Sequence, residues 1–141
     1  MYIQPHFYQS MRIEHLAIWV NDLEASKDFY TKYFNLKANE RYESKRHPFI
    51  SYFLSFENET ETRIELMQKP DIEKNNSRDR GLVHGFAHIA ISIGSKEKVD
   101  ALTERLRADG YKIAGEPRTT GDGYYESIIE DNDGNWIELT S

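Results

Sequence analysis

The feature that most constrains the fold of this chain is an internal repeat. The segment EHLAI at 14–18 recurs as AHIAI at 87–91, and IEL at 64–66 recurs at 137–139. Both pairs are 73 positions apart, so one register without gaps relates more than 50 residues of each half. A constant spacing of this kind indicates two copies of one structural module.

The repeat divides the 141 residues into four parts. Module one is expected at 12–68 and module two at 85–141, with a polar linker at 69–84 that lacks hydrophobic periodicity, as a surface connection should. Residues 1–11 precede the first patterned segment, and we interpret them as an N-terminal extension or a cloning remnant. We treat 12–141 as one domain, because a chain of this length is small for two independent cores.

Each module shows the same order of predicted elements. A strand with alternating apolar residues is followed by a helix, whose predicted N-cap is Asp22 in module one and Ser95 in module two. Three further strands complete each module, and the segment DNDGNW supplies turn residues between the last two of module two. The predicted strands are 12–20, 37–43, 49–57 and 62–68, then 86–93, 111–116, 124–130 and 135–140. This βαβββ order, written twice, predicts an α+β fold in which one helix covers one face of each sheet.

Four polar side chains are expected on the faces that the helices leave free. Because side chains alternate along a strand, His15 and His88 point away from the apolar, helix-facing positions of the first strands. The same alternation places Glu65 and Glu138 on the free faces of the last strands. Taken alone, a histidine in an apolar strand is typical of a hydrogen-bonded core residue, and such a glutamate is typical of a solvated face.

The repeat favours a different interpretation, a metal site. The two histidines and the two glutamates occupy equivalent positions, so modules folded against each other would bring all four around a pseudo-twofold axis. Two carboxylates buried together require a cation, since charges in a low dielectric must be paired or neutralised. Two imidazole nitrogens and two carboxylate oxygens suit Zn, Ni or Co, and then Fe or Mn. The sequence therefore predicts one divalent metal ion per site, bound by His15, Glu65, His88 and Glu138.

Composition excludes several other functions. The net charge is −6 and basic residues form no dense patch, so neither nucleic acid nor an anionic membrane is an expected partner. No apolar run approaches the roughly 20 residues that span a bilayer. The absence of cysteine excludes disulfides, thiolate nucleophiles and sulfur metal ligands. The first residues lack the pattern of a signal peptide, and we expect a cytoplasmic protein that acts on a small molecule.

The segments HLAIWVNDLEASKDFYTKYFNLK, RIELM, HIAISI and DNDGNWIEL resemble the vicinal oxygen chelate superfamily, and within it the glyoxalase I branch, the lactoylglutathione lyases. The resemblance implies the glyoxalase/bleomycin resistance/dioxygenase fold, in which two βαβββ modules form a curved mixed sheet around a metal cleft. It also implies isomerisation of a hemithioacetal through a metal-bound enediolate. The ligand order His–Glu–His–Glu carries over to the four residues already named. We expect Glu138 to be the principal base, with Glu65 as the alternative.

Two positions depart from the glutathione-dependent members of that branch. Trp19 stands four residues after His15, where those members typically carry Arg, and Lys69 stands four residues after Glu65, where they carry Asn. Both family residues bind glutathione, so dependence on glutathione is an open question. The other residues we consider for the substrate pocket are Arg63, Arg118 and Tyr125.

Other members of the superfamily supply alternative functions for this chain. One alternative is an epimerase or a dioxygenase on the same fold. However, epimerases generally have Gln at the Glu65 position, and dioxygenases use three protein ligands. Another alternative is a metal-free protein of the bleomycin-resistance kind, which binds a small molecule.

We expect a homodimer. From Glu65 to His88 the chain runs 23 residues, which is long enough for a site within one chain; this we favour over a site shared between chains.

Overall fold

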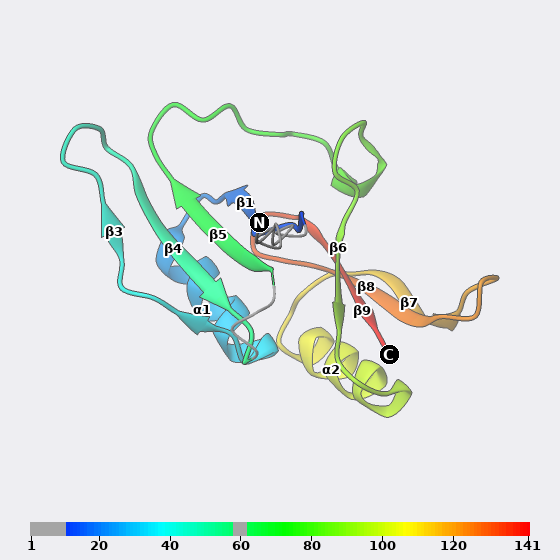
Figure 1. Ribbon diagram of the computed structural model, residues 1–141. Helices are drawn as coiled ribbons and strands as arrows, with labels where there is room; N and C mark the ends of the chain where they lie inside the picture. Colours follow the sequence, from blue (N-terminus) through cyan, green and yellow to red (C-terminus); the bar gives the residue numbers. More distant parts are fainter. Residues whose placement is uncertain (1–10, 58–61) are drawn as a thin grey trace, which may run out of the picture.

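The computed structural model describes residues 11–57 and 62–141, so the expected N-terminal extension lies almost entirely outside the described residues. Module one contains β1 (His15–Trp19), α1 (Leu23–Phe34), β2 (Lys37–Ala38), β3 (Tyr42–Glu43), β4 (Ile50–Ser55) and β5 (Arg63–Gln68). The linker holds a short 3₁₀ helix, η1 (Arg80–Leu82). Module two contains β6 (Ile89–Ser92), α2 (Lys96–Ala108), β7 (Ile113–Thr119), β8 (Tyr125–Glu130) and β9 (Trp136–Thr140). The α+β fold with two βαβββ modules is confirmed (Figure 1).

The two modules form separate mixed sheets. The order is β1-β5-β4-β2 in the first, where β3 also pairs with β4, and β6-β9-β8-β7 in the second. β1 runs parallel to β5, and β6 runs parallel to β9. The remaining pairs of neighbouring strands are antiparallel. The register repeats as well: Ala17 pairs with Glu65 and Ala90 pairs with Glu138, which are positions related by the 73-residue shift.

Both helices begin at the predicted caps. The Asp22 side chain accepts a hydrogen bond from the Ala25 N–H at 3.0 Å, and the Ser95 hydroxyl accepts one from the Lys98 N–H at 3.2 Å. These contacts satisfy amide groups that have no partner inside the helix. α2 ends where Gly110 adopts a positive φ of 91°, a conformation that glycine takes without steric cost.

The second predicted strand of module one is the main local difference. Residues 37–43 form two short strands, β2 and β3, both of which pair with β4. They are separated by the Asn39–Arg41 segment, where the Asn39 amide oxygen accepts a hydrogen bond from the Phe53 N–H at 2.8 Å. A side chain that bonds backbone in place of a ladder partner interrupts the regular pairing.

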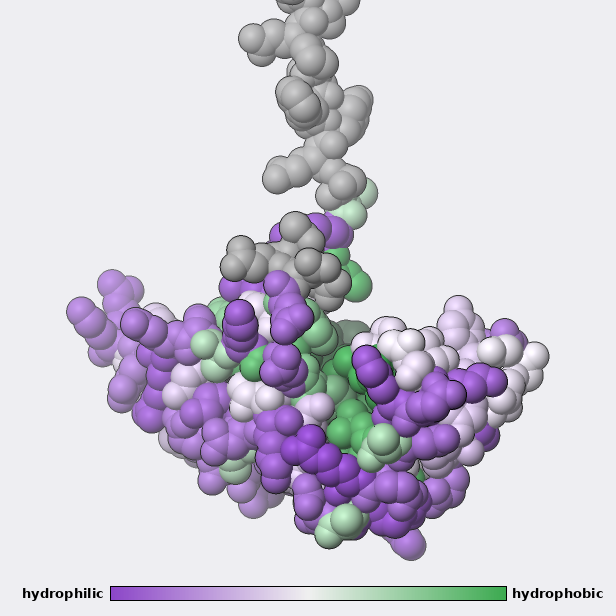
Figure 2. Space-filling view, turned by 90° about the horizontal axis from the view of Figure 1, so that it is seen from below, coloured by the Kyte–Doolittle hydropathy of each residue, from purple (hydrophilic) through white to green (hydrophobic). Residues whose placement is uncertain are grey.

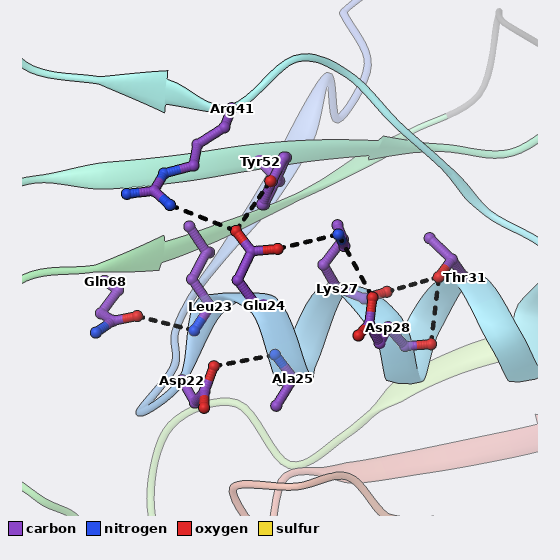
Figure 3. A network of polar contacts seen from close by, with 10 residues as sticks. All are labelled: Asp22, Leu23, Glu24, Ala25, Lys27, Asp28, Thr31, Arg41, Tyr52 and Gln68. Atoms are coloured by element: carbon purple, nitrogen blue, oxygen red, sulfur yellow. Dashed lines mark hydrogen bonds and ion pairs between the residues drawn. The ribbon is translucent and has the colours of Figure 1, made fainter.

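The first turn of α1 is tied to the hairpin above it by a polar network (Figure 3). The Glu24 carboxylate accepts hydrogen bonds from the Tyr52 hydroxyl and from Lys27, each at 3.0 Å, and lies 3.6 Å from Arg41. The Gln68 side chain accepts a hydrogen bond from the Leu23 N–H at 2.8 Å. These contacts hold the start of the helix against β4 and β5.

The modules contact each other through α1. The buried Tyr30 hydroxyl donates to Asp131 of module two at 2.7 Å, and the Tyr33 hydroxyl donates to Asp109 at 2.5 Å. Phe29 packs on Tyr111 with ring centroids 5.0 Å apart. On the face seen in Figure 2, hydrophobic surface lies in a hollow between two mostly hydrophilic lobes. The relative position of the two modules is therefore set by buried contacts and not by the linker alone.

No helix in the described part of the chain is long and apolar enough to cross a membrane.

Candidate metal centre

Module one brings His15 and Glu65 together. His15 opens β1 and Glu65 lies on the parallel neighbour β5, where it is level with Ala17. The histidine Nε2 lies 3.5 Å from a Glu65 carboxylate oxygen. The His15 side chain is 40% exposed and that of Glu65 is 14% exposed. Along β1 exposed and less exposed residues alternate, with His15, Ala17 and Trp19 on the open face, as predicted.

Module two repeats the arrangement with His88 and Glu138. His88 directly precedes β6, and Glu138 lies on β9 opposite Ala90. The His88 Nε2 lies 3.2 Å from a Glu138 carboxylate oxygen, and the two side chains are 38% and 17% exposed. We call His15 with Glu65 the first pair, and His88 with Glu138 the second pair.

The spacing within each pair fits ligands of a common cation. Nitrogen and oxygen ligands about 2.0–2.2 Å from one zinc-like ion are separated from each other by about 3.0–3.5 Å. The two measured separations, 3.5 and 3.2 Å, agree with this spacing. The donors are an imidazole nitrogen and a carboxylate oxygen, which suit borderline and hard divalent ions.

One chain does not bring the two pairs together. Among residues 11–57 and 62–141, no group of three or more histidine and acidic side chains lies close enough to hold a metal ion. The site that we favoured, formed within one chain, is therefore not present in this arrangement of the modules. The relative position of the modules is set instead by the contacts of α1 with Asp131, Asp109 and Tyr111 of module two.

The surroundings of the two pairs differ although the repeat places them equivalently. At the first pair, Glu14 contacts the Nδ1 of His15 and forms an ion pair with Arg63 at 2.5 Å. The contact with His15, and then the Arg63 guanidinium, lower the pKa of Glu14. At the second pair, burial and the neighbouring Glu126 carboxyl raise the pKa of Glu138 to about 7.

Trp19 and Lys69 lie beside each other at the edge of module one. The Lys69 Nζ is 5.2 Å from the centroid of the Trp19 ring, and Phe49 meets that ring edge to face at 6.2 Å. Both residues line a cavity of about 860 Å³ that also reaches His88 and Trp136. The cavity therefore extends from the open face of β1 to the start of β6.

The remaining pocket candidates lie elsewhere or have other partners. Arg63 is held by Glu14 and stacks over the Phe53 ring at 4.1 Å. Arg118 lies 3.9 Å from Glu126, near the second pair. The Tyr125 hydroxyl donates to Asp100 of α2 at 2.5 Å, on the face of β8 that packs against the helix. Alternation along β8 turns Tyr125 away from Glu126 and Glu138.

Two residues beside the pairs, Glu126 and Glu14, were not predicted from the sequence. Glu126 was detectable, since a hairpin at DNDGNW pairs Ile128 with Glu138 and places Glu126 one step along the same face. Glu14 was not, because it precedes β1, and its contact with His15 departs from strand alternation.

Comparison with known proteins identifies the family. A model described as the Glyoxalase/Bleomycin resistance protein/Dioxygenase superfamily matches residues 12–139. YwbC of Bacillus subtilis (strain 168), an uncharacterized protein, is 32% identical over 91% of this chain and 95% of its own length. The lactoylglutathione lyase of Escherichia coli O157:H7 is 30% identical over 92% of this chain and 91% of its own length.

Among solved structures, glyoxalase I from Zea mays superposes with a TM-score of 0.75 and 27% sequence identity. The match covers 92% of this chain but only 44% of the maize chain, so this chain spans less than half of that protein. The trypanothione-dependent glyoxalase I of Leishmania major superposes with a TM-score of 0.70 and 26% identity, and 87% of its chain is covered. The resemblance read from the sequence is thus confirmed, and the chain belongs to the glyoxalase/bleomycin resistance protein/dioxygenase superfamily.

Proposed function

We propose that this chain is a metal-dependent isomerase of the glyoxalase I type, acting on a hemithioacetal or a related substrate with adjacent oxygen atoms. The observation that carries the proposal is the duplicated His–Glu pair, in which the histidine Nε2 and a carboxylate oxygen lie 3.5 Å apart in the first pair and 3.2 Å apart in the second. Relatives at about 30% identity that are lactoylglutathione lyases support it.

The complete site would be shared between two chains. Because one chain holds its two pairs apart, the first pair of one subunit would meet the second pair of its partner. A twofold dimer applies the same contact twice and so completes two sites.

The bound divalent ion would supply a Lewis acid that stabilises negative charge developing on the substrate oxygens. The chain's own carboxylates would move the proton from one carbon to its neighbour. Glu138 is the proposed base, because burial and the adjacent Glu126 carboxyl raise its pKa and so favour proton uptake there. Glu65 instead lies opposite Phe53 across the β4–β5 pair, with no second carboxyl beside it in the register.

Trp19 and Lys69 would contact the thiol carrier of the substrate. An aromatic ring and one cation 5.2 Å from it suit a carrier with an apolar or flat part next to an anionic group. Replacing Lys69 with Gln is expected to raise KM for an anionic carrier while kcat changes little. Adducts of methylglyoxal with glutathione and with other thiols, compared in parallel, would identify the carrier.

Metal analysis tests the proposal directly. Protein purified without chelator is titrated with Ni, Co, Zn, Mn and Fe, and each form is assayed for isomerase activity. Wild type is expected to bind one ion per chain, and the Glu65→Gln/Glu138→Gln variant to lose it. Glu104→Gln/Glu116→Gln is the matched control, because it removes two carboxylates of equal charge that pair with Arg107 on the surface. A wild type that binds no divalent ion at micromolar concentration would refute the proposal.

Mixed dimers test the shared site. One chain carries His15→Ala/Glu65→Gln and the other carries His88→Ala/Glu138→Gln, so neither homodimer has a complete site. After the two are unfolded and refolded together, half of the sites in each heterodimer contain both intact pairs and should bind metal. If mixing restores no metal binding, the site is not shared in this way.

The cavity of about 860 Å³ favours a second candidate function, the binding of a small molecule without turnover. Trp19 and Trp136 give it aromatic walls, which are typical of ligand pockets. A chain with this function would bind a ligand in the absence of any metal, and the titration above separates the two candidates.

A further inference from the structure

The carboxylate of Glu14 bridges two side chains. One of its oxygens contacts the Nδ1 of His15, and the other accepts hydrogen bonds from Arg63 at 2.8 Å from Nε and 2.5 Å from Nη2. An ionised carboxylate can only accept hydrogen bonds, so in the neutral imidazole ring, which carries one N–H, that proton must sit on Nδ1. The lone pair of His15 is then on Nε2, the nitrogen that lies 3.5 Å from Glu65.

Packing holds the same ring orientation. Phe53 meets the His15 ring edge to face, with centroids 5.3 Å apart, and Arg63 stacks over Phe53 at 4.1 Å. Arg63 therefore restrains both Glu14 and Phe53. We name this group of three residues around His15, namely Glu14, Arg63 and Phe53, the brace.

The second pair has no brace. The positions 73 residues after Glu14, Arg63 and Phe53 hold Ala87, Trp136 and Glu126. No hydrogen bond to the Nδ1 of His88 is found among the residues that the structure describes, and its one polar contact there is with Glu138. The brace is thus specific to the first pair and is not a by-product of the repeated fold.

We propose that Glu14, held by Arg63, is a positioning residue that fixes His15 in the Nδ1–H tautomer and presents its Nε2 to the metal. The proposal rests on the proposed metal-dependent function. Histidine ligands of metals generally donate their other ring N–H to a carboxylate or carbonyl, which orients the ring and strengthens the ligand. This assignment gives Arg63 a role in holding the metal site, in place of the substrate contact considered from the sequence.

Two measurements test the brace, and neither depends on enzymatic activity. The first is the ring ¹⁵N NMR spectrum of His15 in the chelator-treated protein, which reports the tautomer. The second is the affinity for Co²⁺, obtained by competition with a chromophoric chelator. The variants are Glu14→Ala, which removes the acceptor, and Glu14→Gln, which keeps an acceptor oxygen but loses the charge. Glu24→Gln is the control, because this carboxylate also joins a polar network on module one but lies on α1 (Figure 3).

In wild type, the spectrum is expected to show the Nδ1–H tautomer, and Glu14→Ala is expected to show a mixture of tautomers. The Co²⁺ affinity should fall about 10- to 100-fold in Glu14→Ala, the range typical for loss of such a partner. The Co²⁺ affinity of Glu14→Gln should fall by less, and that of Glu24→Gln should equal the affinity of wild type. All variants should keep the thermal midpoint of wild type within a few degrees, since Glu14 and Arg63 are partly exposed.

Equal Co²⁺ affinity in wild type and Glu14→Ala would overturn the proposal and leave the metal-dependent function standing. An Nε2–H tautomer of His15 in wild type would overturn it as well. A wild type that binds no metal would overturn the proposed function, and with it the role of the brace.

Discussion

The contact between Tyr30 and Asp131 is the buried polar link between the two modules, and removing it has a calculable cost. Tyr30→Phe keeps the ring, which packs against Phe29 with centroids 5.0 Å apart, and deletes only the hydroxyl. Tyr30 is fully buried and Asp131 is 7% exposed, so water cannot replace the lost donor without rearrangement.

Asp131 retains other partners after the substitution. It still accepts hydrogen bonds from the backbone N–H groups of Asp133 at 2.9 Å and Asn135 at 2.8 Å, and from the Asn135 side chain at 3.0 Å. One hydrogen bond to a charged group is therefore lost while the carboxylate stays partly satisfied. Such a bond contributes about 1.5–3 kcal/mol. We expect the free energy of unfolding to fall by this amount in Tyr30→Phe.

The assay is equilibrium unfolding in urea followed by circular dichroism, with an unchanged m-value showing that the same surface is exposed. Tyr33→Phe is the matched control, because its hydroxyl also joins α1 to module two, through Asp109. The Asp109 side chain is 39% exposed, so its contact should contribute less than about 1 kcal/mol. Buried hydrogen bonds to a charged group contribute more to stability than this. The role assigned to the Tyr30–Asp131 contact would therefore be refuted if Tyr30→Phe lowered the free energy of unfolding by less than about 0.5 kcal/mol, or by no more than Tyr33→Phe does.

Three further predictions concern the linker, a helix cap and pH. In Gly81→Ala the new Cβ would overlap the ring of Trp136, so η1 or the Trp136 side chain must shift. We expect a loss of about 1–3 kcal/mol in unfolding free energy and a red shift of the Trp136 fluorescence. Unchanged fluorescence would contradict the contact. Ser95→Ala removes the cap of α2 and should cost about 1 kcal/mol in urea unfolding, whereas an equal stability would mean that the cap is replaced. Burial raises the pKa of Asp131 above its ordinary value of 3.8. The stability that this carboxyl contributes is therefore fully present below pH 3.8 and is lost as the pH rises through the raised pKa, because the unfolded chain then ionises more readily. The unfolding free energy of wild type minus that of Asp131→Asn should decrease over this interval, and a constant difference would contradict the shift.

The repeat in the sequence predicted most of the fold. One shift of 73 residues was enough to find both modules, both N-caps and the two His–Glu pairs, because each follows from local chemistry that recurs at equivalent positions. Strand alternation placed His15 on an open face and Ile18 on the other side, as the structure confirms. The split of 37–43 into β2 and β3 was not predicted, since it depends on a side-chain contact of Asn39 with the neighbouring strand.

The arrangement of the two modules could not be read from the chain in the same way. Patterns along a strand show which face a residue occupies, but they contain no information about which pair of faces will meet across a long linker. That outcome depends on contacts between distant residues, such as Tyr30 with Asp131, and on the pinning of η1 against Trp136. The same limit applies to Arg63, which was considered for the substrate pocket from the sequence: its contacts with Glu14 and Phe53 join residues that lie far apart in the chain. The four candidate ligands were therefore evident from the sequence, whereas their separation into two pairs within one chain follows from buried contacts that no local pattern encodes.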